Sequence, residues 1–221
     1  MKLVHAITQR LVWIITFASM RVFSKFYIVG QENLNNLSTP LLVVANHKSY
    51  WDSMILGTLF PFFSNKYLPL GFIAADEFFD NPFYNFFLNS TGVSRANKGK
   101  GLDISLKNFR SILSNNGAVV IFPFGKRVYD DNMQPTPSRG AAVLVQEFPT
   151  ITVLPVFLNT TGKLSIREFI FGKKEMGVVV GVPYKIVSAQ NKSIEDLSKI
   201  LTDSFLVLNQ KQKIAALSAN F

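Results

Sequence analysis

Short apolar runs alternate along this chain with longer segments of helical spacing, and polar or glycine-containing turns separate them. The apolar runs are rich in Val and Ile, which favours buried strands, whereas one helical segment follows Ser193 as N-cap and another has Pro82 near its first position. Such an alternation is typical of an α/β domain. The pattern predicts strands at 26–29, 41–45, 71–75, 118–122, 151–156 and 178–182, and helices from Trp51, from Pro82, at 102–113, from 138 and at 193–209.

Residues 1–25 are apolar but carry basic residues at intervals, including Arg10 and Arg21. The uninterrupted apolar stretch, residues 11–20, is about half the roughly 20 residues that a membrane-spanning helix needs. A signal peptide is disfavoured because a small-residue cleavage site is missing. We expect a membrane-interface helix, with Arg and Lys at headgroup level and Trp13 as an anchor. A helix buried on the domain and a full span stay open as alternatives.

Residues 54–90 are crowded with aromatic side chains. We expect a large hydrophobic core to contain most of them, because large apolar residues are usually buried. The group at 83–87 has two further interpretations, an acyl-chain tunnel or a contact with lipid. Apolar periodicity does not separate these three interpretations.

Composition narrows the classes of partner and of chemistry. The chain has 221 residues, a formal net charge of +9 and a positive mean hydropathy of +0.22. A protein that is both basic and apolar suits an anionic membrane surface better than a nucleic acid. The absence of Cys excludes a thiol nucleophile and a Cys-ligated zinc site, and the two His exclude a His-rich metal site. Asp130 and Asp131 are expected in an exposed turn, so we expect no metal site.

The strongest candidate for chemistry is His47, which follows the apolar run 41–45, together with Asp52 in the first turn of the next predicted helix. If the turn folds back, Asp52 reaches one imidazole nitrogen and leaves the other free as a base. The alternative is a structural pair, because the helix dipole alone favours an Asp in a first turn. Ser49 lies between the two and is expected to make a local hydrogen bond instead of acting as a nucleophile.

Four short motifs extend this observation. Asn46-His47 and Asp52 after an apolar strand resemble the first motif of the glycerolipid acyltransferases, the PlsC-like family of 1-acylglycerol-3-phosphate acyltransferases. Residues 92–95, a strand that ends in Arg95, are similar to the second motif of that family. Residues 122–127 resemble the third motif, Phe-Pro-Glu-Gly-Thr-Arg, and the strand around Pro155 resembles the fourth. The motifs stand in family order over roughly residues 26–205.

The resemblance implies one acyltransferase domain, residues 26–221, with a central mixed sheet and helices on both faces, behind the membrane segment 1–25. It implies transfer of a fatty acyl group from acyl carrier protein or coenzyme A to the hydroxyl of a lysophospholipid, such as 1-acylglycerol 3-phosphate, in phospholipid biosynthesis. No cofactor beyond this co-substrate is expected, and the expected location is the cytoplasmic face of the inner membrane. The implied catalytic residues are His47 as general base and Asp52 as its orienter; the implied substrate-binding residues are Asn46, Arg95, Gly125, Lys126 and Arg127.

Two positions depart from the third motif: Phe124 stands where the family has Glu, and Lys126 where it has Thr. In the family that Glu and the motif's Arg help to hold the glycerol phosphate of the acceptor. Two alternatives therefore stay open. One is an acyltransferase with another acceptor, such as an amino-acid lipid or a secondary metabolite. The other is a non-enzymatic lipid-binding protein, against which the intact His47 and Asp52 argue.

Overall fold

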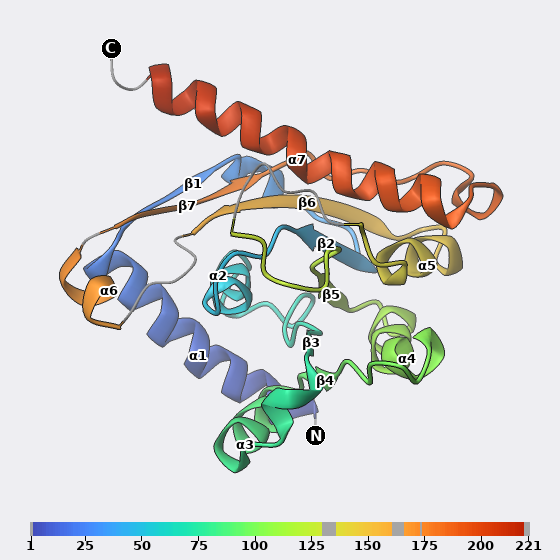
Figure 1. The fold of residues 1–221 in the computed structure, drawn as a ribbon, viewed down its shortest axis with the longest axis horizontal. Helices are drawn as coiled ribbons and strands as arrows, with labels where there is room; N and C mark the ends of the chain where they lie inside the picture. The colour runs from blue at the N-terminus through green and yellow to red at the C-terminus, as the bar shows by residue number, and fades with distance from the viewer. Residues whose placement is uncertain (1, 130–135, 161–165, 173, 219–221) are drawn as a thin grey trace.

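Strand β2 (Leu41–Ala45) is fully buried, because strands pair with it on both sides. In the computed structural model, which describes residues 2–129, 136–160, 166–172 and 174–218, the parallel neighbours of β2 are β5 (Ala118–Ile121) and β6 (Thr152–Asn159). Strand β7 (Glu175–Val180) runs antiparallel to β6, and β1 (Lys25–Val29) runs parallel to β7. The sheet order β1-β7-β6-β2-β5 confirms the predicted mixed α/β architecture (Figure 1).

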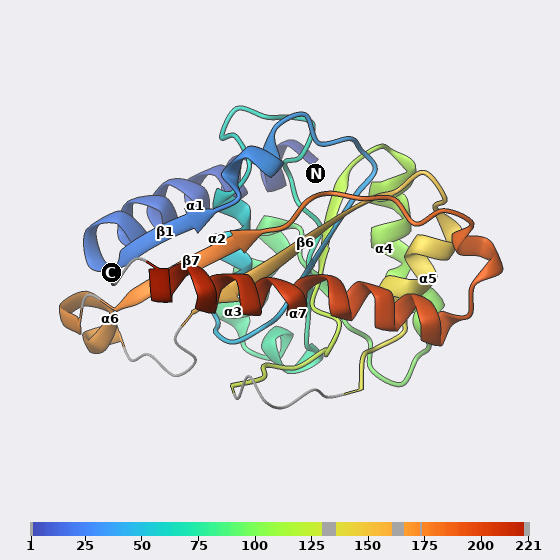
Figure 2. The ribbon, with the colours of Figure 1, turned by 90° about the horizontal axis from the view of Figure 1, so that it is seen from above.

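Alternate residues of β2 contact opposite faces of the sheet, as the two-residue period of a strand requires. Leu41 and Val43 belong to the cluster that includes side chains of α1 (Lys2–Phe23) and α2 (Asp52–Thr58). Leu42 and Val44 belong to the cluster on the other face. That second face is covered by α4 (Leu102–Ser114), α5 (Gly140–Glu147) and α7 (Ile194–Ser218), as Figures 1 and 2 show.

Two helix starts carry side-chain caps, and the one at Ser193 confirms a prediction. The side chain of Asn81 accepts hydrogen bonds from the first turn of α3 (Pro82–Thr91), and Gly92 ends that helix in a left-handed conformation at φ 76°. Ser193 Oγ accepts from the backbone N–H of Asp196 at 3.0 Å in α7. The remaining elements are short: α6 (Ile166–Gly172), η1 (Gln31–Leu34), η2 (Asp76–Phe79), η3 (Ala189–Asn191), and the parallel pair β3 (Ile73–Ala74) and β4 (Ser94–Arg95).

Helix α1 is packed against the domain through its polar side chains. Gln9 exchanges hydrogen bonds with the backbone of Leu70, and Arg10 Nε donates to the carbonyl of Phe62 at 2.9 Å. Trp13 Nε1 donates to the carbonyl of Phe60 at 3.1 Å. Both side chains therefore satisfy carbonyls of the loop after α2, and the headgroup level of Arg10 and the anchoring role of Trp13 stay predictions.

The segment Leu3–Phe23 is nevertheless long and apolar enough to cross a membrane, judged by length and composition alone. It exceeds the uninterrupted stretch seen in the sequence because the helix continues through Gln9 and Arg10. A domain boundary at residue 25 stays a prediction. The turn predicted at Asp130 and Asp131 lies outside the described residues.

Candidate active site

The carboxyl end of β2 delivers His47 to a tight turn that precedes α2. Asn46 fixes this end, because its side-chain amide pairs with both backbone groups of Leu158 in β6, at 2.6 Å and 2.9 Å. Asn46 is buried, and these contacts give it a role in holding β2 to β6. Its predicted contact with substrate stays a prediction.

His47 and Asp52 meet across this turn, since His47 Nδ1 lies 2.8 Å from Asp52 Oδ2. An ionised carboxylate accepts only, so Nδ1 carries the proton and Nε2 keeps its lone pair. The His47 side chain is 18% exposed, whereas Asp52 is fully buried. Nε2 makes no hydrogen bond to any residue that the structure describes. The contact with Asp52 fixes the tautomer of a partly exposed imidazole, in which Nε2 can act as a base.

Asp52 accepts four further hydrogen bonds. Its Oδ2 accepts from the backbone N–H groups of Lys48 at 2.6 Å and Ser49 at 2.8 Å. Its Oδ1 accepts from Ser49 Oγ at 2.7 Å and from Thr160 Oγ1 at 2.8 Å. Burial raises the pKa of Asp52, but the hydrogen bond and charge of His47 and the hydrogen bonds from Ser49 outweigh it, so the net pKa lies below 3.8. The carboxylate therefore stays ionised at neutral pH.

Two residues of this site were not predicted from the sequence. Thr160 directly follows β6, and the parallel pairing of β6 with β2 brings it to Asp52. Phe122 stacks on the imidazole of His47, with ring centroids 4.2 Å apart and planes 14° apart. The backbone N–H of Val128 also donates to the His47 carbonyl at 2.8 Å, so the loop after β5 holds the histidine from a second side.

Two of the three predicted cations, Arg127 and Arg95, lie on aromatic rings. The Arg127 guanidinium stands 3.9 Å from the ring centroid of Tyr50 and donates to the hydroxyls of Tyr50 and Tyr129. Gly125, at φ 62°, makes the tight turn that precedes Lys126, and both are exposed. Arg95 lies 4.6 Å from the ring centroid of Phe79. The convergence of Arg95 and Arg127 on one anion stays a prediction.

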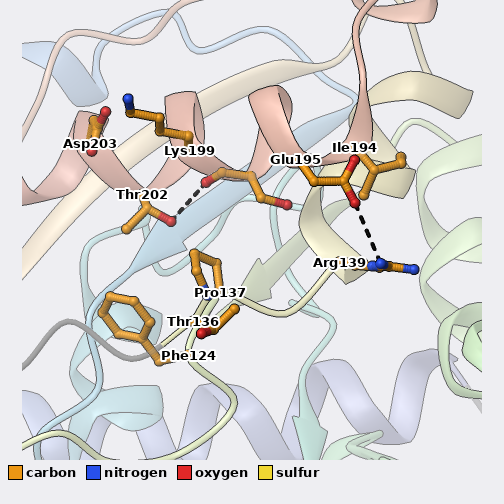
Figure 3. Close-up of a pocket in the computed structure, with 10 residues that line it drawn as sticks. Phe124, Thr136, Pro137, Arg139, Ile194, Glu195, Lys199, Thr202 and Asp203 are labelled. Atoms are coloured by element: carbon orange, nitrogen blue, oxygen red, sulfur yellow. Dashed lines mark hydrogen bonds and ion pairs between the residues drawn. The ribbon is translucent and has the colours of Figure 1, made fainter.

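Phe124, the departure from the third motif, points to the other face of the sheet. Its ring centroid lies 5.9 Å from that of Phe205 in α7, within the cluster opposite His47. It also lines a cavity of about 450 Å³ beneath α7, where Arg139 and Glu195 form an ion pair at 3.4 Å (Figure 3). Neither His47 nor Asp52 lines this cavity.

Residues 25–159 match the family model described as Acyltransferase, which is more than half of the chain. This chain belongs to the acyltransferase family. The family predicted from the four motifs is thereby confirmed. The acyltransferase match runs from β1 to the last residue of β6, and it includes His47, Asp52 and the loop around Gly125.

Named relatives agree with the family. A Saccharomyces cerevisiae protein named 1-acyl-sn-glycerol-3-phosphate acyltransferase is 26% identical over 168 residues, 74% of this chain and 52% of the relative. A Chlamydomonas reinhardtii relative of that name is 30% identical over 150 residues, 66% of this chain and 42% of its own. This acyltransferase chain thus spans about half or less of the length of these two relatives.

A solved structure shows the same fold. The crystal structure of the 1-acyl-sn-glycerophosphate (LPA) acyltransferase PlsC from Thermotoga maritima matches this acyltransferase with a TM-score of 0.67. The match covers 92% of this chain and 79% of the other chain. Sequence identity is 18%, so this likeness is evidence of the fold alone.

Proposed function

We propose that this protein transfers a fatty acyl group from a thioester, carried by acyl carrier protein or coenzyme A, to the free hydroxyl of a lysophospholipid such as 1-acylglycerol 3-phosphate. The observation that carries the proposal is the 2.8 Å contact between His47 Nδ1 and the buried Asp52, which leaves Nε2 accessible. The name shared by the relatives supports the acceptor class.

The proposed reaction needs no protein nucleophile. His47 Nε2 takes the proton from the acceptor hydroxyl as its oxygen attacks the thioester carbonyl carbon. The carbon–sulfur bond then breaks, and the proton passes from His47 to the departing thiolate. Asp52 holds the imidazole and stabilises the imidazolium formed during attack, with its own position fixed by Ser49 and Thr160.

Arg127 is the proposed contact for the phosphate of the acceptor, assisted by Lys126 and Arg95. A guanidinium matches a phosphate through two parallel hydrogen bonds. Since Phe124 points towards α7, the departure from the family Glu at this position leaves the cation intact. An anionic amino-acid lipid would satisfy the same arginine, so acceptor kinetics must separate these substrates.

We further propose that the protein works on an anionic membrane surface, held there by α1. The support is a net charge of +9 and the long apolar helix Leu3–Phe23. Because thioesters of acyl carrier protein and coenzyme A are cytoplasmic, we propose the cytoplasmic face of the inner membrane as its location.

The test of the proposed reaction is His47→Ala, with His5→Ala as the matched control for loss of a histidine. Loss of a general base lowers kcat by about 10²–10⁴. We expect that fall for His47→Ala and none for His5→Ala, with circular dichroism showing both proteins folded. Near-normal turnover of lysophosphatidate and an acyl thioester by folded His47→Ala protein would exclude the mechanism.

A further inference from the structure

The exposed stripe of α1 is apolar, the reverse of a surface helix in a soluble protein. Gln9, Arg10 and Trp13 bond to the domain, while the apolar side chains of the opposite side face outward. This outward stripe recurs at helical spacing and consists of Leu3, Val4, Ile7, Leu11, Ile14, Ile15 and Val22. An apolar stripe of this length marks an interaction surface.

Helix α3 and the loop after α2 extend this apolar surface. On α3, Phe83 is 73% and Phe86 is 75% exposed. The two helices are joined, because Gln9 Nε2 donates to the carbonyl of Thr91, the last residue of α3, at 2.8 Å. Figure 1 shows α3 beside the N-terminal half of α1, on the side of the sheet opposite α7. Phe63, at 86% exposed, stands beside α1 through its contact with Phe62.

A row of aromatic rings leads from α3 to the candidate anion site. The ring of Phe83 contacts that of Tyr84 at 5.9 Å, and Tyr84 contacts Phe78 at 6.3 Å. Phe78 contacts Tyr50 at 6.1 Å, and the Arg127 guanidinium stands over Tyr50. These contacts form a continuous row of rings from the exposed apolar surface of α3 to the guanidinium of Arg127.

We propose that α3 is a second membrane-inserting element, which places Phe83 and Phe86 in the same lipid leaflet as the outward stripe of α1. The acceptor lipid then reaches Arg127 along the aromatic row with its tail still in the membrane. A lipid leaflet fits because the surface is apolar over two helices and a loop, and because exposed Arg21 borders the apolar stripe of α1. The inference rests on the membrane attachment through α1 proposed above.

The absence of Cys makes the test direct, since one introduced thiol can be labelled uniquely. Three full-length variants, Ile15→Cys in α1, Phe86→Cys in α3 and Val187→Cys on the α7 side, carry an environment-sensitive fluorophore. Val187 is 82% exposed and serves as the matched control. Each is mixed with vesicles of phosphatidylcholine and phosphatidylglycerol, with and without nitroxide-labelled lipid that quenches only membrane-embedded dyes.

We expect the labels at positions 15 and 86 to shift to shorter wavelength and to be quenched, and the label at 187 to do neither. Quenching at 15 but not at 86 overturns the α3 inference and leaves membrane attachment through α1 standing. No quenching at either position overturns both. A blue shift at 86 that grows with protein concentration without vesicles shows contact between copies of the chain, and also overturns the inference.

A second measurement avoids labels altogether. Phe83→Ser with Phe86→Ser removes the aromatic rings of α3, and Val182→Ser with Val187→Ser removes two exposed apolar side chains elsewhere. If both phenyl rings insert into lipid, their removal weakens vesicle binding by about a hundredfold. We expect that loss for the phenylalanine pair alone in co-sedimentation; equal binding by both double variants contradicts the inference.

Discussion

The surroundings of Asp52 and of Arg127 differ, because the protein encloses the Asp52 carboxylate but leaves the Arg127 guanidinium partly exposed. Asp52 is buried, and both of its oxygens are occupied by groups of the protein. Arg127 is partly exposed, and within the part of the chain that the structure describes it contacts the ring and hydroxyl of Tyr50 and the hydroxyl of Tyr129. The hydrogen bonds that position the proposed base are therefore formed without substrate, whereas we propose that the cationic half gains its counter-charge from a ligand. Changes in the first half should alter kcat, and changes in the second should alter acceptor KM.

A large effect on acceptor binding is expected from the cationic half. Arg127→Ala should raise the acceptor KM for lysophosphatidate by about ten- to a hundredfold, because a hydrogen bond to a charged group is lost. The KM for the acyl thioester should stay unchanged. Steady-state kinetics check this, with Arg139→Ala as the control for removal of an exposed arginine.

An uncharged monoacylglycerol sharpens this comparison. If Arg127 holds the phosphate, the wild-type protein should prefer lysophosphatidate, and Arg127→Ala should remove that preference. Equal use of both acceptors by the wild type would mean that Arg127 binds no acceptor anion.

A smaller effect on kcat is expected when one hydrogen bond that positions Asp52 is removed. Thr160→Val keeps the shape of the side chain but removes one hydrogen bond to Asp52, so kcat should fall by about two- to tenfold with acceptor KM unchanged. Thr160→Ser should restore kcat, because it restores the hydroxyl. Thr152→Val is the matched control, since its buried hydroxyl has no hydrogen-bond partner among the described residues. A slow Thr160→Ser protein, or a fall in kcat for Thr152→Val, would contradict this role.

The smallest effect is on stability in acid. The folded-state pKa of Asp52 is below 3.8, so its ionised form stabilises the fold fully above that pH and loses this effect as the pH falls through the folded-state pKa. The free energy of unfolding of the wild type should therefore approach that of Asp52→Asn as acid is added. Urea unfolding from pH 7 to pH 3 measures this, with Asp203→Asn as an exposed control. A constant difference between wild type and Asp52→Asn would contradict the direction of the pKa shift.

Patterns within short stretches of sequence predicted much of the fold and the pairing of His47 with Asp52. The apolar run of β2, the cap at Ser193 and the spacing of His47 and Asp52 all lie within a few residues of the structure they specify. Thr160 follows Asp52 by 108 positions in the sequence and reaches it only because β6 pairs with β2 in one register. No periodicity along the chain encodes that register.

Helix α1 shows a second limit. Its basic residues predicted headgroup contacts, yet the guanidinium of Arg10 donates hydrogen bonds to carbonyls of the loop after α2. Composition gives the amount of apolar surface on a helix but not which side of it the domain occupies. Which side of α1 faces the domain is set by its packing partners, and these are distant in the sequence.

The central claim is that Asp52 acts through His47, and a double-mutant cycle tests it most directly. Asp52→Asn alone should lower kcat by about a hundredfold, because the imidazole loses its orienting carboxylate. Introduced into folded His47→Ala protein, the same change should lower kcat no further, since there is no imidazole left to orient. A second hundredfold loss in the double variant would contradict the account, because Asp52 would then act independently of His47.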